Sequence, residues 1–241
     1  ICRYDEETGT EDKSIYGIGI AVGMKICIKI MKGAATMVSL RDTYSQVKDF
    51  VLDTDNYMPV VWGIDSEGQV VKSDLKSIDS MCIAGMPRKG KSWCVQAIIT
   101  QIVMFHKPSE VQLHIFDPKE GTSDFKAMST LPHVREFKTK DEDVLAGLKR
   151  IVNVEAPRRM KMIGDANCVN IWDFKKKCPS VDLPLLYVVI DEVITFSERM
   201  KDKSPESAKE FQSLLLQFVS RLPNLGIRLF MIPHIIKDQI L

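Results

Sequence analysis

The chain has 241 residues, of which 45% are hydrophobic and 27% charged, values that are ordinary for a soluble globular protein of one large domain or one domain with a small appendage. Its formal net charge of +1 neither indicates nor excludes a nucleic-acid partner, so any DNA-binding surface has to be local or assembled by oligomerisation. The six cysteines form no C-x-x-C pair, which argues against zinc, and the sequence contains neither a membrane-length apolar run nor a secretory signal.

The first 58 residues predict a small α+β subdomain. The sequence begins with Ile rather than Met, which indicates part of a longer chain, and residues 1–14 are polar and acidic, as in a poorly ordered lead-in. Residues 25–32 alternate lysines with apolar side chains, the pattern of a half-exposed β-strand. Asp42 is placed to cap a helix that extends to about Asp53 and carries apolar side chains on one face.

A hairpin is predicted next, at the start of a second domain that takes up residues 59–241. Two β-rich runs lie on either side of a turn that contains Asp65, Ser66 and Gly68. After a short connection, residues 80–84 are mostly apolar and suit a buried strand.

Gly85 to Ser92 reads GMPRKGKS, a full match to the phosphate-binding P-loop pattern G-x-x-x-x-G-K-[ST]. Gly85 and Gly90 allow backbone amides and the N-terminus of a helix that extends to Phe105 to approach a phosphate. Lys91 would reach the β- and γ-phosphates of ATP, and the Ser92 hydroxyl would bind Mg²⁺. The predicted nucleotide-binding residues are Gly85, Met86, Pro87, Arg88, Lys89, Gly90, Lys91, Ser92 and Trp93.

Another strand is predicted at residues 111–116. Polar residues directly after a strand lie on the ligand edge of a doubly wound sheet, so Asp117 and Lys119 are candidates to face the nucleotide. A plain turn explains the same two residues equally well.

A helical pattern follows from 141 to 162, with Pro157 expected to bend or interrupt it. Residues 163–183 are then rich in loop-forming residues and basic. Their run Lys175-Lys176-Lys177 predicts a solvated face in preference to a DNA contact.

The run from Leu185 to Glu192, LLYVVIDE, is the second motif. It is an apolar strand, of the kind found inside a parallel sheet, that ends in two adjacent acids. Asp191 would hold Mg²⁺, directly or through water, and Glu192 would polarise the attacking water. Together with the P-loop, this motif indicates ATP hydrolysis.

Residues 197–207 are polar and charged and predict either a mobile loop or the edge of a gap in the ordered chain. An amphipathic helix is expected from 208 to 222, and a last core strand from 227 to 232. The whole pattern predicts an α/β fold of the P-loop NTPase (RecA-like) class, in which helices flank a mostly parallel sheet and a small N-terminal α+β subdomain precedes it.

In these motifs the chain resembles the motor domain of the FtsK/SpoIIIE and HerA family of ring-forming DNA-pumping ATPases, from about residue 60 to residue 241. Within that family it looks most like the coupling ATPases (TcpA-like) of conjugative plasmids of Gram-positive bacteria. The positions that carry the resemblance are Trp62-Gly63-Ile64-Asp65, Gly68, Asp74-Leu75, Asp117-Pro118-Lys119, Pro132-His133, Glu155, Arg158-Arg159, Asn170, Asp191-Glu192 and Gly226-Ile227-Arg228-Leu229.

The resemblance implies roles for two further residues. His234 stands where the family commonly has a Gln that senses the γ-phosphate, and Arg221 lies near the place of the arginine that acts on a neighbouring subunit. The rival arginines are Arg158, Arg159 and Arg228. The P-loop departs from the family pattern, since Pro87, Arg88 and Lys89 make it stiffer and more positive. The implied catalytic residues are Lys91, Asp191, Glu192, His234 and Arg221.

The resemblance also implies the function: a homo-hexameric ring that uses ATP and Mg²⁺ to move DNA, here plasmid DNA during conjugative transfer. DNA and other components of a transfer apparatus are the implied partners, and the motor would work at the cytoplasmic face of the cell membrane, anchored by a segment outside this sequence. The C-terminal end is expected to be truncated, because no winged-helix domain follows. Two alternatives stay open: a type VII secretion-like ATPase that acts on protein substrates, and a non-catalytic nucleotide-binding ring scaffold.

Overall fold

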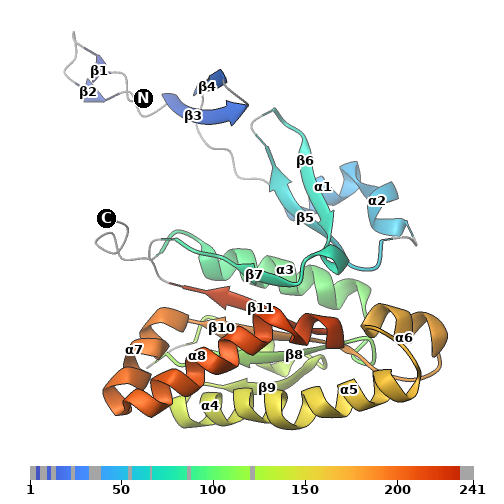
Figure 1. Ribbon diagram of the computed structural model, residues 1–241. Helices are drawn as coiled ribbons and strands as arrows, with labels where there is room; N and C mark the ends of the chain where they lie inside the picture. The colour runs from blue at the N-terminus through green and yellow to red at the C-terminus, as the bar shows by residue number, and fades with distance from the viewer. Residues whose placement is uncertain are drawn as a thin grey trace. The chain divides into compact units, whose positions relative to one another are not determined.

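The computed structural model describes residues 4–5, 10–11, 15–22, 25–32, 39–53, 56–65, 67–85, 88–119 and 123–233 (Figure 1). The chain divides into two compact units. One consists of Ile1–Asp53 with Val61–Ser73, and the other of Thr54–Val60 with Asp74–Leu241. The boundary between residues 58 and 59 stays a prediction.

The first unit contains short strands and two short helices. β3 (Ile15–Val22) and β4 (Lys25–Lys32) pair antiparallel, which confirms the strand expected at 25–32, and β1 (Tyr4–Asp5) pairs with β2 (Thr10–Glu11). The helix expected at 42–53 is present in two pieces, α1 (Leu40–Gln46) and α2 (Lys48–Leu52). Its N-cap is Ser39 rather than Asp42, which lies inside the first turn.

The predicted hairpin is formed by β5 (Pro59–Ile64) and β6 (Val70–Asp74), which pair with each other. The amide of Asp65 donates to the carbonyl of Gln69 at 2.8 Å and closes the turn. Gly68 has a φ of +82°, a conformation that strains residues with a side chain, so glycine suits this turn.

A five-stranded parallel sheet is the centre of the second unit, with the strand order β7-β11-β10-β8-β9. Its strands are β7 (Ser80–Cys82), β8 (Val111–Phe116), β9 (Val134–Lys138), β10 (Leu185–Asp191) and β11 (Ile227–Ile232). β10 lies in the middle and every one of its residues is buried, as its apolar run predicts. The predicted α/β class with a mostly parallel sheet is therefore confirmed.

Helices cover both faces of this sheet (Figure 1). α3 (Lys91–Phe105) lies on one face and buries Val95, Ile98 and Ile102. The other face is covered by α4 (Asp141–Arg150), α5 (Ala156–Asp165), α7 (Val193–Lys203) and α8 (Pro205–Ser220). The core on that side combines buried residues of these helices with alternate strand residues, namely Leu186, Val188, Ile190, Ile227 and Leu229. Among the described residues, no helix is both long and apolar enough to cross a membrane.

The helix predicted at 141–162 is continuous but changes its geometry. A π-helical segment (Ile151–Glu155) separates α4 from α5. Pro157 lies in the first turn of α5, so the interruption predicted at this proline occurs in the residues just before it.

The prediction that residues 163–183 form a loop is wrong in part, because they contain α6 (Ile171–Lys177). The side chain of Asn170 caps this helix by accepting hydrogen bonds from the amides of Trp172 and Asp173 at 2.9 and 3.0 Å. Within the helix, Ile171 and Phe174 are buried. One polar cap and two apolar anchors are enough to order a segment whose composition suggests a loop.

The prediction of a mobile loop at 197–207 is also wrong. α7 occupies most of it, and Ser204 separates α7 from α8 by accepting a hydrogen bond from the amide of Ser207 at 3.1 Å. Phe196 and Met200 are four residues apart and both buried, so the charged side chains between them lie on the outer face of a helix.

Gly147 lies where α4 touches the sheet. A Cβ atom at this position would come within 2.8 Å of two ring carbons of Phe116, which is fully buried. We expect Gly147→Ala to lower the free energy of unfolding by about 1–3 kcal/mol, as measured by urea denaturation, because the ring has no room to move.

Gly164→Ala in α5 is the matched control, because nothing lies within 4 Å of its added Cβ. There the higher helix propensity of alanine is expected to raise the stability by up to about 1 kcal/mol. Similar changes in the free energy of unfolding for the two variants would contradict the tight packing of α4 on Phe116.

Candidate functional site

The carboxyl ends of the parallel strands lie along one edge of the sheet, and both predicted motifs are found there. β7 leads into the loop at 85–92, and β10 ends at Asp191, in register with Ile232 of the intervening β11. Residues of both motifs line one cleft of about 810 Å³. The residues that line it are Arg88, Gly90, Lys91, Ser92, Trp93, Gln96, Lys119, Asp124 and Glu192.

The described part of the P-loop turns into α3 at a glycine. Gly90 precedes the first residue of α3 with a φ of +85°, in the left-handed region that glycine adopts without strain. Lys91 is 7% exposed, and its Cγ and Cδ atoms lie 3.7 Å from where a Cβ of Gly85 would be. Gly85 therefore lies beside the stem of Lys91, and Gly90 permits the turn into the helix.

Ser92 contacts an acid that the sequence did not identify. Its hydroxyl donates to Oδ2 of Asp124 at 3.0 Å, and Nε2 of Gln96 donates to the carbonyl of Asp124 at 2.7 Å. Gln96 is four residues after Ser92, so helical spacing alone could have placed it on the same face. No pattern in the sequence marks Asp124, which reaches Ser92 only through the fold.

Lys119, one of the two candidates after β8, does face the cleft. Its Nζ lies 3.4 Å from Oδ2 of Asp124 and 3.9 Å from Oε1 of Glu192. Burial alone would lower the pKa of Lys119, but the carboxylates of Asp124, Asp191 and Glu192 outweigh burial and raise it. Lys119 is therefore charged at neutral pH.

Asp117 and Asp191 form a buried acidic pair at the ends of the adjacent strands β8 and β10. Burial, followed by the charge of Asp117, raises the pKa of Asp191 to about 6, and burial also raises the pKa of Asp117. Oδ1 of Asp191 accepts from the amide of Glu192 at 2.8 Å, whereas its Oδ2 has no hydrogen-bond partner in the described part of the chain. The side chain of Ser123 partly offsets the effect of burial on the pKa of Asp117. Buried oxygens of this kind fit Mg²⁺, which prefers oxygen ligands.

Glu192 follows β10 in a strained conformation. Its φ of +51° is in the left-handed region, which non-glycine residues rarely adopt, and it caps the start of α7. This turn directs its carboxylate into the cleft beside Lys119.

Arg221 lies away from this cleft. It is exposed at the end of α8, shortly before β11 begins, and therefore near the sheet edge opposite the P-loop. Two of its rivals, Arg159 and Arg228, are each 1% exposed. Arg159 bonds to Glu155, and Arg228 to the carbonyl of Lys76, so neither can reach another subunit.

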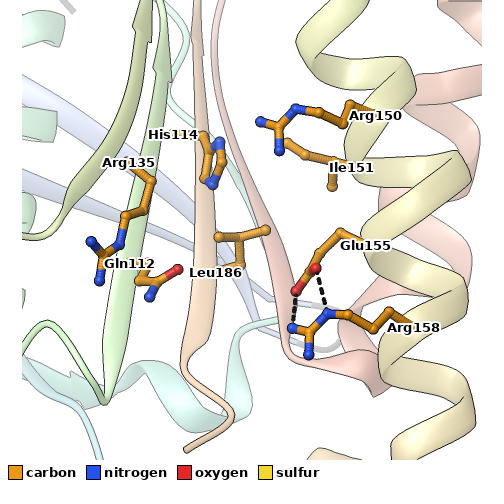
Figure 2. Close-up of a pocket in the computed structure, with 8 residues that line it drawn as sticks. All are labelled: Gln112, His114, Arg135, Arg150, Ile151, Glu155, Arg158 and Leu186. Carbon is orange, nitrogen blue, oxygen red and sulfur yellow. Dashed lines mark hydrogen bonds and ion pairs between the residues drawn. The ribbon is translucent and has the colours of Figure 1, made fainter.

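The third rival, Arg158, lines a second and smaller pocket. Figure 2 shows this pocket between the strands, which carry Arg135 and His114, and the helical wall with Arg150 and Arg158. Its volume is about 250 Å³, and Arg158 donates to both carboxylate oxygens of Glu155 at 2.8 and 2.7 Å. Arg158 is thus engaged within its own chain.

Three predicted site residues, Met86, Pro87 and His234, lie outside the described residues. Lys89 belongs to the P-loop and is exposed, but it does not line the cleft.

Comparison with known proteins identifies proteins that are similar to this chain in sequence and in structure. Residues 48–224 match the model of the FtsK/SpoIIIE family. The chain is 28% identical over 179 residues to DNA translocase SpoIIIE of Bacillus subtilis, an alignment that covers 70% of this chain and 22% of that protein. This chain therefore spans about a fifth of the length of that relative.

Two solved structures share the fold. One is the conjugation coupling protein TcpA of pCW3 in its monomer form with ATPγS, with a TM-score of 0.64, 21% identity and coverage of 91% of this chain and 60% of that one. The other is the cytoplasmic domain of the type VII secretion ATPase EccC of Thermomonospora curvata, with a TM-score of 0.63, 24% identity and coverage of 76% and 22%.

Proposed function

The chain belongs to the FtsK/SpoIIIE family, and from this membership we propose that it is an ATP-hydrolysing motor that moves DNA. Residues 59–241 would be the motor domain and residues 1–58 a small accessory domain. The name of the relative in Bacillus subtilis supports DNA as the substrate, and the fold shared with the coupling protein TcpA supports the more specific proposal of plasmid DNA during conjugation.

One observation supports the proposal most directly. Lys91, Ser92 and Glu192 come from segments a hundred residues apart and line a single cleft. Next to Glu192 lies the buried pair of Asp117 and Asp191, whose carboxylate oxygens fit a bound Mg²⁺.

In the proposed mechanism, Lys91 and the amides of residues 85–92 bind the phosphates of ATP. The Ser92 hydroxyl and the Asp191 carboxylate hold Mg²⁺, which neutralises charge on the phosphate oxygens when it is bound. Glu192 accepts a proton from the attacking water, and His234 is proposed to contact the γ-phosphate.

We further propose that the active form is a homo-hexameric ring at the cytoplasmic face of the cell membrane, anchored by a segment outside this sequence and joined to other components of a transfer apparatus. Arg221 precedes the start of β11, whereas the P-loop lies where the strands end, so we propose that Arg221 acts in the site of a neighbouring subunit. DNA would be bound through its phosphates, without preference for sequence.

Trp93 should contribute to nucleotide affinity by stacking on the base. It is 78% exposed, at the third position of α3, and lines the cleft. We expect Trp93→Ala to weaken ATP binding about tenfold, in the range reported for base–aromatic stacking, and Trp93→Phe to retain most of the affinity. Titration of both variants with ATPγS measures this. Equal affinities for wild type and Trp93→Ala would assign the base to another part of the cleft.

The function is tested by ATPase assays with and without double-stranded DNA at several salt concentrations. DNA is expected to stimulate hydrolysis, and the stimulation should fall steeply with salt because phosphate contacts release counterions. ATP hydrolysis that DNA leaves unchanged at low salt would count against a DNA motor.

A second candidate is an ATPase that acts on protein substrates, which the likeness to the type VII secretion ATPase EccC favours. Stimulation of ATP hydrolysis by a secreted peptide, with no response to DNA, would support this function. A non-catalytic ring scaffold is the third possibility. It predicts nucleotide binding without turnover, or no binding, in a titration of the purified chain.

A further inference from the structure

The turn after β8 places the ammonium group of Lys119 between the two sides of the cleft. Ser92 donates to Asp124, Lys119 pairs with Asp124 at 3.4 Å, and Lys119 also pairs with Glu192 at 3.9 Å. These contacts run from the P-loop helix to the acid proposed to activate water. Lys119 is thus the group that connects the acid beside Ser92 with Glu192.

This turn is held to α7 at a second point. The carbonyl of Pro118 accepts a hydrogen bond from Nη2 of Arg199, seven residues after Glu192 on the same helix, and Arg199 also pairs with Asp141 at 2.9 Å. The amide of Lys119 donates to the carbonyl of Asp117 at 2.7 Å. The backbone just before Lys119 is therefore hydrogen-bonded to the helix that follows Glu192.

The ion pairs of Lys119 are weak enough to be exchanged. Its side chain is 30% exposed, and both pair distances exceed those of charge-assisted hydrogen bonds, which are about 2.7–2.9 Å. The pair of Lys119 with Asp124, whose side chain is 47% exposed, is of the surface kind that contributes about 0–1 kcal/mol. A terminal phosphate, which carries more charge than a carboxylate, would displace them.

The strand order places the backbone of Lys119 away from the strand that leads into the P-loop. β8 is three strands from β7, and neighbouring strands lie about 4.8 Å apart, so the two strands are roughly 14 Å apart. The P-loop after β7 is proposed to hold the phosphates from one side of the cleft, with Lys91 on the β- and γ-phosphates, whereas Lys119 lies on the other side beside Glu192, where the terminal phosphate and the water would meet. We propose that Lys119 is a specificity-determining residue that contacts the terminal phosphate and so distinguishes nucleoside triphosphate from diphosphate. This inference rests on the proposed nucleotide function of the same cleft.

The experiment measures binding of ATPγS and of ADP, both with Mg²⁺, to the full 241-residue chain by calorimetry. For Lys119→Ala, we expect the dissociation constant for ATPγS to rise about tenfold and that for ADP to change less than twofold. Lys119→Arg should restore ATPγS binding to within about threefold of wild type. Lys126→Ala, which removes an exposed lysine outside the cleft, should change neither affinity.

Each other outcome is decisive. If Lys119→Ala weakens the binding of ATPγS and of ADP equally, Lys119 attracts anions in general and does not distinguish the two nucleotides. If both affinities are unchanged, a phosphate contact is excluded. Unaltered ADP binding also shows that the variant is folded. If the wild-type chain binds ATPγS and the Lys119 variants do not differ from it, the inference fails while the nucleotide function stands. If the wild-type chain binds no nucleotide, both are overturned.

Discussion

Lys91→Ala is expected to abolish measurable ATP binding, with the dissociation constant raised about 100-fold or more. Lys91 is almost fully buried, its stem lies beside Gly85, and it lines the cleft. Removal of one partner of a buried charge pair costs about 2–5 kcal/mol, and about 1.4 kcal/mol corresponds to each tenfold change in affinity. Calorimetric titration with ATPγS and Mg²⁺ measures the loss.

Lys89→Ala is the matched control for this variant, because it removes the same charge from the same loop. Lys89 is exposed and does not line the cleft, so its contribution would come from the backbone amide, which the substitution keeps. We expect its affinity for ATPγS to stay within about fivefold of wild type, since surface charges are largely screened. Comparable losses of ATPγS affinity for the Lys91 and Lys89 variants would contradict a specific role of Lys91 in the phosphate site.

Glu192→Gln is expected to leave nucleotide binding intact and to lower the turnover of ATP about 1,000-fold. Glutamine keeps the shape and the hydrogen-bonding reach of the side chain but cannot accept a proton from water, and general base catalysis contributes about 100- to 10,000-fold. A steady-state ATPase assay, alongside the titration with ATPγS, separates turnover from binding.

Glu198→Gln tests whether loss of any negative charge on α7 has the same effect. Glu198 is exposed on that helix and does not line the cleft, so its variant should hydrolyse ATP at the wild-type rate. Normal hydrolysis by the Glu192 variant would remove it from the role of base, and Asp117 would become the acid to examine next.

The parts of the site that could be predicted are those that depend on short stretches of sequence. Gly85, Gly90 and Lys91 form a contiguous pattern, and the apolar run that ends at Asp191 marks a central strand. Because the ends of parallel strands meet at one edge, the two motifs could be expected in the same cleft.

The parts that could not be predicted depend on contacts between distant segments. Asp124 has no motif and reaches Ser92 across 32 positions of sequence. The charge-rich composition of residues 197–207 concealed a helix, because the pair Phe196 and Met200 lies at its edge and partly outside that window. Whether Asp117 and Lys119 face the nucleotide or belong to a plain turn was equally undecided, since polar residues after a strand suit both.

The position of β7 has a consequence for how the protein is made. β7 is an edge strand of the sheet, and its neighbour there is β11, which is about 145 residues later in the sequence. During synthesis, the strand that leads into the P-loop has no place in the sheet until residues 227–232 have left the ribosome. The nucleotide cleft is therefore completed late, after the α4 to α8 layer has been translated, and a nascent chain that stalls before β11 carries both motifs without the strand that brings them together.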